Sequence, residues 1–556
     1  MTSRQICSTL ASLMSQYDIS EVIVSPGSRN AVIIEALHKS GNFNLVPVID
    51  ERSAAFIALG HAMISNKCVA LVCTSGSALL NYGPAIAEAC YRRLPLLIIS
   101  ADRPHEIIDR NDGQTIVQPD AFSNLTGKSY NISHNESKEY INLLLNEAMN
   151  SATKPAAIPV HINVEIADPS LTTGCEADAP KTQKIEFFNN SHLLPQEQMK
   201  QLAGELSSPR RVMVVAGGMQ PSQRLSKALS KLCGFGSWIV LADNVANLHG
   251  RGIVTGLFSV CSHESLKHKP EIFPDIVITI GSPIISSHLK DFIKYIDCEH
   301  WHVGVEERAQ DTFGKLTKSI TAAPEVFFAQ LIANIRRNNS VSTFTNDWLK
   351  FAQSAYSEAK QYIATTKWSD IKALTTILSS TPRSCNVQLS NGLTSRYAQV
   401  LPFDFHRVDC NRGVSGIDGS TSTAIGAAQA FEGTTLLVTG DMSAQYDIGC
   451  LTTGQVPSNL KIVLMDNGGG TIFNFIKGTR SSSITADYLA ISHQYNVDKI
   501  AASAGIKVFY ASNEVELKTE LKHFFQHNFE PAMLVVKTDS NESAQVFTEF
   551  LKRNKK

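Results

Sequence analysis

Short runs of apolar residues recur along the chain, and each ends in Gly, Ser, Asp or Thr just before a stretch with helical spacing. The runs lie in EVIVSPGSRN (21–30), CVALVCTSGSALL (68–80), PLLIISADRP (95–104), RRVMVVAGG (210–218), PDIVITIGSP (274–283), TTLLVTGD (434–441) and KIVLMDNGGGTIF (461–473). Continuous apolar runs that feed helices are typical of buried parallel strands. The pattern predicts an α/β protein with doubly wound parallel sheets, in which ligands bind beyond the carboxyl ends of the strands.

The length of the chain predicts several domains. A chain of 556 residues exceeds the roughly 250–300 residues at which a single hydrophobic core stops growing. A polar, strand-poor stretch (170–184) and a polar stretch with helical spacing (343–369) separate the groups of predicted strands. We therefore predict three doubly wound domains that span residues 1–180, 181–345 and 346–556.

Composition and charge exclude several classes of function. Lys and Arg number 50 against 51 for Asp and Glu, so no overall field attracts the protein to nucleic acid or to an anionic membrane. The 11 cysteines form no C-x-x-C pair and are interpreted as reduced core thiols. The apolar runs fall short of the roughly 18 residues of a membrane span, and the N-terminus lacks the features of a signal peptide. We expect a cytoplasmic protein that binds neither nucleic acid nor membrane.

The ends of two predicted strands carry the residues of a metal and phosphate site. Asp441 follows one strand, and Asn467 with three glycines follows the next. A hard divalent cation that bridges a diphosphate prefers oxygen ligands, here the Asp441 carboxylate, the Asn467 amide oxygen and the Gly469 carbonyl. The glycines let the main chain approach phosphate groups. On spacing alone, an ordinary turn and a plain strand-to-helix loop explain these residues equally well.

The Gly-Asp pair followed by Asn467 resembles the signature of thiamine diphosphate-dependent enzymes. Further motifs occur in order: VSPGSRN (24–30), DERSAAF (50–56), SADRP (100–104), DGQTIVQP (112–119), SNGLTSR (390–396) and CNRGVSGIDGSTSTAIG (410–426). Together they resemble the 2-succinyl-5-enolpyruvyl-6-hydroxy-3-cyclohexene-1-carboxylate (SEPHCHC) synthase family of menaquinone biosynthesis. The resemblance implies a pyrimidine-binding domain (1–180), a central domain (181–345) and a diphosphate-binding domain (346–556).

The resemblance assigns the activation of the cofactor to Glu51, which would exchange a proton with N1′ of the aminopyrimidine. Burial of this residue after a strand would raise its pKa, as that role requires. Without the resemblance, Glu51 is better explained as a helix cap or as the partner of Arg52. The metal, Mg²⁺ or Mn²⁺, is assigned to Asp441, Asn467 and Gly469, and Ile417 is the apolar wedge beneath the cofactor. The other implied cofactor contacts are Thr74, Ser75, Gly76, Ser415, Gly440, Met442, Ser443, Gly470, Thr471, Ile472 and Phe473.

The family decarboxylates 2-oxoglutarate and adds the succinyl unit to isochorismate in a Stetter-like 1,4-addition. Both substrates are polyanions, and guanidinium groups bind carboxylates through two parallel hydrogen bonds. The alternative for each arginine is an ordinary ion pair. The implied substrate contacts are Ser28, Arg29, Arg103, Gln114, Asn391, Arg396 and Arg412, and of these Arg29, Gln114, Arg396 and Arg412 join Glu51 in catalysis.

The chain departs from the family pattern in two places. Ser287 and His288 stand where the family carries adjacent Lys and Arg, which weakens the grip on a carboxylate unless Lys290 compensates. Gly392 stands where many relatives have Ser. These departures leave open another thiamine diphosphate-dependent 2-oxoacid decarboxylase or carboligase with a different acceptor.

A second alternative is a nucleotide-binding protein without catalytic activity. The first predicted strand is not followed by G-x-G-x-x-G, which disfavours this alternative. The presence of Glu51 together with Asp441 and Asn467 also disfavours it. In the superfamily one subunit binds the pyrimidine and another binds the diphosphate. The resemblance therefore implies a homodimer or homotetramer with active sites at the subunit interface.

Overall fold

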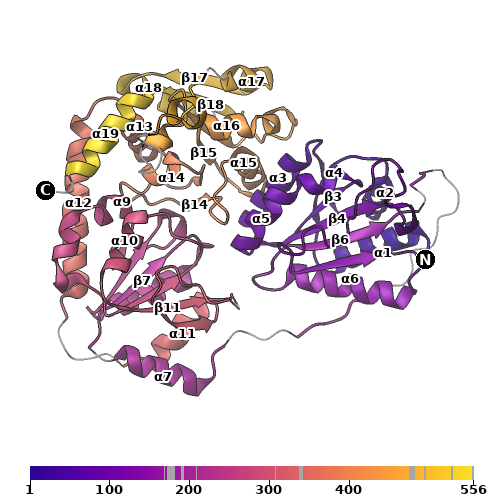
Figure 1. Cartoon of the computed structure of the whole chain (residues 1–556), viewed down its shortest axis with the longest axis horizontal. Coiled ribbons are helices and arrows are strands. Elements are labelled where there is room, and N and C mark those ends of the chain that lie inside the picture. Colours follow the sequence, from indigo (N-terminus) through magenta and orange to yellow (C-terminus); the bar gives the residue numbers. More distant parts are fainter. Residues whose placement is uncertain are drawn as a thin grey trace.

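The computed structural model describes residues 1–553 except for 168, 172–181, 189–192, 208, 307, 337–341, 475–481, 494–495 and 527–529. Three parallel sheets of six strands each follow one another along the chain, with helices packed around them (Figure 1). Adjacent strand residues belong to different apolar cores, so that Leu71 and Val72 lie on opposite faces of the first sheet. Both faces are therefore buried, and the predicted α/β class with doubly wound parallel sheets is confirmed.

The first sheet has the strand order β2-β1-β3-β4-β6-β5. Its strands are β1 (Glu21–Val24), β2 (Asn44–Pro47), β3 (Val69–Cys73), β4 (Leu96–Asp102), β5 (Lys128–Ile132) and β6 (Val160–Glu165). The accompanying helices are α1 (Ser3–Gln16), α2 (Ala31–Ser40), α3 (Glu51–Ser65), α4 (Ser77–Asn81), α5 (Gly83–Arg92) and α6 (Lys138–Thr153).

The second sheet has the order β12-β11-β10-β7-β8-β9, which is the order of the dinucleotide-binding α/β fold. Its strands are β7 (Val212–Ala216), β8 (Trp238–Ala242), β9 (Ile253–Val254), β10 (Ile276–Ile280), β11 (Glu299–Gly304) and β12 (Leu316–Thr321). Its helices are α7 (Gln196–Ser207), α8 (Gln223–Cys233), α9 (Leu257–Cys261), α10 (Ser287–Tyr295) and α11 (Pro324–Asn334).

The third sheet has the order β14-β13-β15-β16-β18-β17, which repeats the order of the first sheet. Its strands are β13 (Asn386–Leu389), β14 (Arg407–Cys410), β15 (Thr435–Gly440), β16 (Leu460–Asp466), β17 (Lys507–Ala511) and β18 (Ala532–Lys537). Its helices are α13 (Asp370–Ser380), α14 (Leu393–Tyr397), α15 (Ser420–Ala430), α16 (Asp441–Tyr446), α17 (Val497–Ser503), α18 (Glu514–Gln526) and α19 (Ser540–Arg553).

The helix α12 (Phe344–Thr365) joins the second and third sheets. Phe344 and Trp348 pack in a core of the second sheet, whereas Ala359 and Ile363 pack in a core of the third. The predicted division between residues 345 and 346 thus falls inside a helix that both domains share. The predicted division between residues 180 and 181 lies outside the described residues.

The first and third domains dock through α3 and α15, which face each other in Figure 1 and share one continuous apolar core. Gly60 and Gly426 lie at this crossing, and a Cβ at Gly426 would lie 1.9 Å from the carbonyl oxygen of Ile57. The two helices therefore touch backbone to backbone.

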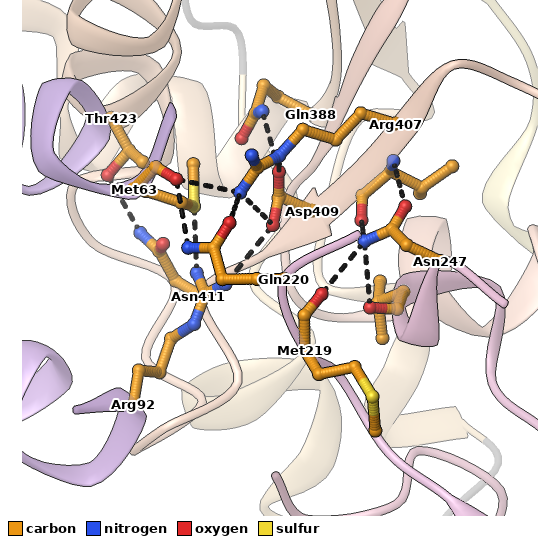
Figure 2. Close-up of polar contacts among 12 residues, drawn as sticks. Met63, Arg92, Met219, Gln220, Asn247, Gln388, Arg407, Asp409, Asn411 and Thr423 are labelled. Atoms are coloured by element: carbon orange, nitrogen blue, oxygen red, sulfur yellow. Dashed lines mark hydrogen bonds and ion pairs between the residues drawn. The ribbon is translucent and has the colours of Figure 1, made fainter. Parts of the chain in front are cut away.

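All three domains meet in a buried polar junction (Figure 2). Arg407 on β14 donates to the Met63 carbonyl of α3 and to Gln220 of the second domain, both at 2.8 Å. The same arginine pairs with Asp409 at 2.5 Å, and Asp409 also pairs with Arg92 of α5 at 3.2 Å.

Among the described residues, no helix is long and apolar enough to cross a membrane.

Candidate active site

Asp441 and Asn467 leave the third sheet at one edge, because β15 and β16 are paired neighbours. The Gly469 N–H lies 3.2 Å from Asp441 Oδ2 and 3.3 Å from Asn467 Oδ1. Two oxygens predicted as metal ligands therefore converge on one point. Such a pair of carboxylate and amide oxygens suits Mg²⁺ or Mn²⁺.

A buried aspartate sets the orientation of Asn467. Asn467 Nδ2 donates to Asp370 Oδ2 at 2.8 Å, and Thr538 Oγ1 donates to the other oxygen of Asp370 at 2.5 Å. Because the amide nitrogen is held by Asp370, the amide oxygen faces Asp441. Asp370 lies 97 residues before Asn467 in the sequence, and no sequence motif marked it as a site residue.

The third predicted ligand fits less well. The Gly469 carbonyl accepts hydrogen bonds from Thr471 N at 2.8 Å and from Thr471 Oγ1 at 3.3 Å. These bonds use both lone pairs of the oxygen, so a metal would have to displace one of them. Among the described residues, no cluster of three His, Cys, Asp or Glu side chains forms another candidate metal site.

His493 closes the same site from a later part of the chain. His493 Nε2 lies 3.0 Å from Asp441 Oδ2, and both side chains are buried. Burial raises the pKa of Asp441 to about 6, while the neighbouring His493 opposes the rise. No sequence motif pointed to His493, since its approach to Asp441 depends on the fold.

Glu51 is the first residue of α3, at the carboxyl-end edge of the first sheet. Asp50 caps this helix by accepting hydrogen bonds from Arg52 N at 3.0 Å and Ser53 N at 3.5 Å. Arg52 donates to the Tyr446 carbonyl at 3.0 Å and lies over the Tyr446 ring. Asp50 is thus the residue that caps the helix, and Arg52 contacts Tyr446. These contacts give neither of the two structural roles, helix cap or partner of Arg52, to Glu51. Burial raises the pKa of Glu51, and the adjacent Asp50 adds to the rise.

The segment Thr74 to Gly76 forms the loop that follows β3, and Gln114 contacts this loop. Ser75 Oγ donates to the Gln114 carbonyl at 3.1 Å, and Gln114 Nε2 donates to the Ser75 carbonyl at 3.3 Å. Gly76 has φ +85°, a conformation that favours glycine. Thr74 Oγ1 is buried and has no hydrogen-bond partner among the described residues. An orphaned hydroxyl in this loop fits a site that receives a polar ligand.

Gln118 anchors this loop and was missed in the sequence. Its Oε1 accepts from Gly76 N at 2.8 Å, and its Nε2 donates to Asn163 Oδ1 at 2.8 Å. The side chain is fully buried. Gln118 belongs to a motif that resembles the family, but its bonding partner on β6 lies 45 residues away.

Residues 411–418, called here the wedge loop, carry Arg412, Ser415 and Ile417. Asn391 Nδ2 donates to the carbonyls of Asn411 and Gly416, the latter at 2.6 Å, and Ser443 Oγ donates to the Ile417 carbonyl at 2.6 Å. Asn391 Oδ1 accepts from Arg412 Nη1 at 3.2 Å. Asn391 therefore shapes the loop, and its predicted contact with substrate stays a prediction.

Arg396 lies close to Arg412 of the wedge loop. Arg396 donates to the Gly392 carbonyl at 2.6 Å. Burial and the nearby positive charge of Arg412 lower the pKa of Arg396. Burial, followed by the charge of Arg412, also lowers the pKa of Lys290 on α10. Three cations from two domains thus occupy one region.

The other predicted substrate residues lie in the first domain. Arg29 donates to the Ile166 carbonyl at 2.7 Å, and Arg103 pairs with Asp112 at 3.0 Å. Ser28 and Gln114 are exposed. Arg103 therefore has the ion pair that was its structural alternative, and its substrate role stays a prediction.

The remaining predicted cofactor contacts surround the Asp441 edge. Asp441 is the first residue of α16, Gly440 precedes it, and Met442 N donates to Asp441 Oδ1 at 2.7 Å. Gly470 leads into the short 3₁₀ helix Thr471–Asn474, which contains Ile472 and Phe473. The fold brings all of these residues to one edge.

The chain matches two families of cofactor-binding domains. Residues 5–123 match "Thiamine pyrophosphate enzyme, N-terminal TPP binding domain", and residues 392–536 match "Thiamine pyrophosphate enzyme, C-terminal TPP binding domain". The first match contains Glu51 and the second contains Asp441 and Asn467.

Curated relatives agree over nearly the whole length of the chain. It is 34% identical to a SEPHCHC synthase of Flavobacterium johnsoniae over 98% of both chains. It is 37% identical to that of Flavobacterium psychrophilum over 90% of both. The chain belongs to the SEPHCHC synthase family. A third relative, the SEPHCHC synthase of Porphyromonas gingivalis, is 34% identical over 98% of this chain and 96% of its own length.

Proposed function

We propose that this member of the SEPHCHC synthase family is a transferase that uses thiamine diphosphate to release CO₂ from 2-oxoglutarate and to join the remaining four-carbon unit to isochorismate in menaquinone biosynthesis. One observation carries the proposal: a half-buried glutamate with a raised pKa and a converging pair of metal-type oxygens lie at strand ends of two sheets. The relatives and both matched domains agree with it.

The residues suit thiamine diphosphate with Mg²⁺ or Mn²⁺. Asp441 and Asn467 would hold the metal that neutralises the diphosphate, with Gly469 as the proposed third ligand. When bound, the cofactor supplies the thiazolium carbon that takes up the donor and acts as the electron sink. Glu51 would hold the proton that the aminopyrimidine exchanges, and the rise in its pKa on burial favours the protonated form that this role requires.

The cationic region suits two substrates that carry several carboxylates. Arg396 and Arg412 would bind carboxylates through paired hydrogen bonds, and Lys290, on the same helix as Ser287 and His288, adds a third charge. Arg29, Arg103, Gln114, Asn391 and Ser28 are proposed as further substrate contacts. Gly392 has φ +102°, a conformation that a side chain there would rarely adopt.

We further propose a homodimer or homotetramer with shared active sites in the cytoplasm. Large apolar side chains are exposed in a single chain beside the site residues of both halves. Ile49, two residues before Glu51, is 83% exposed, and Leu80, Val117, Val414, Ile417 and Tyr446 are each at least 39% exposed. Exposed apolar residues that gather around a polar site indicate a surface that a partner covers.

A comparison of donors tests the substrate assignment. CO₂ release from 2-oxoglutarate and from pyruvate is measured with the purified protein, thiamine diphosphate and Mg²⁺. The cationic region predicts a preference for 2-oxoglutarate of at least about tenfold in kcat/KM, since one charge-assisted carboxylate contact contributes on the order of 1.5–3 kcal/mol. A preference for pyruvate would assign the protein to another carboligase reaction.

A further inference from the structure

We propose that Glu88, a buried carboxylate on α5 of the first domain, is a positioning residue that clamps the wedge loop of the third domain and thereby sets the geometry of Arg412. The consequence for substrate rests on the function proposed above. The clamp itself rests on contacts alone.

The Glu88 carboxylate binds two successive backbone N–H groups. Glu88 Oε1 accepts from Gly413 N at 2.8 Å, and Oε2 accepts from Val414 N at 2.8 Å. Glu88 is 1% exposed, so these bonds are shielded from water and stronger than at the surface. The contacted residues directly follow Arg412.

The clamp complements the contacts that the third domain makes with the loop. Asn391 and Ser443 donate to loop carbonyls, whereas Glu88 accepts from loop N–H groups. The third domain thus holds the carbonyl side and the first domain holds the amide side. Ser415 has φ +61°, an unfavourable conformation for a residue with a side chain. Contacts on both sides are what keep such a loop in one conformation.

The geometry at position 88 calls for a side chain with two acceptor oxygens, one for each N–H group. Glutamine offers one acceptor oxygen and would turn its NH₂ group towards the second N–H donor. Burial raises the pKa of Glu88, and Arg92, one turn later on α5, together with the two loop N–H groups and Arg412, opposes the rise. Arg92 also pairs with Asp409 on β14, the strand that leads into the wedge loop (Figure 2).

The loop lies directly against the clamp. A Cβ at Gly413 would lie 2.8 Å from the Glu88 carbonyl oxygen and 3.0 Å from Glu88 Oε2. Alanine at position 413 would therefore push the loop away from Glu88 without changing a buried residue. Glu88→Gln and Gly413→Ala test one contact from its two sides.

The experiment measures the clamp and its consequence separately on the full chain. Hydrogen exchange of the Gly413 and Val414 amides, read by NMR or by overlapping peptides in mass spectrometry, reports the clamp without any substrate. KM and kcat for 2-oxoglutarate and isochorismate report the consequence. Arg93→Gln is the control, because Arg93 follows α5 directly and pairs with Glu306 of the second domain at 3.3 Å.

We expect Glu88→Gln and Gly413→Ala to speed exchange at both amides and to raise the KM of at least one substrate about tenfold, with kcat changed less than about threefold. Arg93→Gln should leave these quantities unchanged. If Glu88→Gln does not fold, the hydrogen exchange and the KM values of Gly413→Ala decide whether the clamp exists. Unchanged hydrogen exchange at the Gly413 and Val414 amides in a folded variant would overturn the proposal. Equally fast exchange and an equal rise in KM in Arg93→Gln would also overturn it. If the unsubstituted protein turns over neither substrate, the proposed function fails while the exchange still decides the clamp.

Discussion

At the scale of single residues, Glu51 shows how neighbouring side chains free one group for chemistry. Asp50 caps α3, and Arg52 contacts Tyr446. Glu51, between them, lies at the edge of a parallel sheet with its pKa raised by burial. The position of Glu51 after a strand was predictable from the sequence. The structure was needed to show that Asp50 caps the helix and that Arg52 contacts Tyr446.

Replacing Glu51 by glutamine tests its role. We expect Glu51→Gln to bind thiamine diphosphate within a few-fold of the unchanged protein and to lose at least about 100-fold in kcat, the usual contribution of general acid–base catalysis. Calorimetry measures the binding and the CO₂-release assay measures kcat. Glu139→Gln is a matched control, because Glu139 also lies in the first turn of a helix. Loss of folding in Glu51→Gln alone would show that Glu51 is structural.

Asp243 predicts a dependence of stability on pH. Burial raises its pKa to about 7, while Ile285 N, Arg412 and Lys290 oppose the rise. A raised pKa means that folding takes up a proton between about pH 4 and about pH 7, so the stability due to Asp243 is lost as pH rises through about 7. Relative to Asp243→Asn, the unchanged protein should lose on the order of 2 kcal/mol between about pH 5 and about pH 8. Thermal unfolding of both proteins at the two pH values measures this, and parallel pH profiles would contradict it.

Sequence reasoning found the residues that act through their position after a strand, and it missed those that act through the fold. Asp441 and Asn467 follow predicted strands, and the structure places them together. Gln118, His493 and Glu88 bind residues that are distant in the sequence; Glu88 and Gly413 are 325 residues apart. No local pattern encodes such contacts.

At the scale of elements, the crossing of α3 and α15 carries the docking of the first and third domains. Glycines at the crossing let the backbones touch, as Gly60 does against the Thr423 carbonyl. Small residues are frequent in both segments, in SAAFIALGHA (53–62) and in STSTAIGAAQA (420–430). Their mutual contact was not predictable, because small residues alone do not identify the partner helix.

Two identical substitutions should have opposite effects on stability. Gly426→Ala places a Cβ 1.9 Å from a backbone oxygen, so the unfolding free energy should fall by about 1–3 kcal/mol or more. Gly204→Ala in α7 meets nothing within 4 Å and should raise it by about 0.5–1 kcal/mol, since alanine favours a helix over glycine. Thermal denaturation compares the two. Equal changes in the unfolding free energy of the two variants would mean that α3 and α15 are packed less closely than described.

At the scale of the whole molecule, the chain has three α/β units joined by a shared helix, a shared core and the junction of Figure 2. The number of domains followed from length and from the grouping of strands. The strand orders and the role of α12 could not be predicted from the sequence, because they depend on contacts between residues that are distant along the chain. The stretch 343–369 was predicted as a helical, polar break, and it contains a helix of 22 residues whose two ends pack in different domains.

Mixed dimers test the shared site. Glu51→Gln and Asp441→Asn homodimers should each be inactive, whereas their mixture should recover about one quarter of full activity after exchange of subunits, since half of the dimers then carry one intact site. Mass spectrometry of differently labelled chains verifies the exchange. No recovery in verified mixed dimers would place each site within one chain.

The most direct test of the central claim is ultraviolet monitoring of isochorismate consumption by the purified protein. The assay contains thiamine diphosphate, Mg²⁺ and 2-oxoglutarate, and each component is omitted in turn. Our account predicts that isochorismate disappears only in the complete mixture and that CO₂ release accompanies it. CO₂ release from 2-oxoglutarate without loss of isochorismate would contradict the assigned acceptor and direct the search to the region of Ser287, His288 and Gly392.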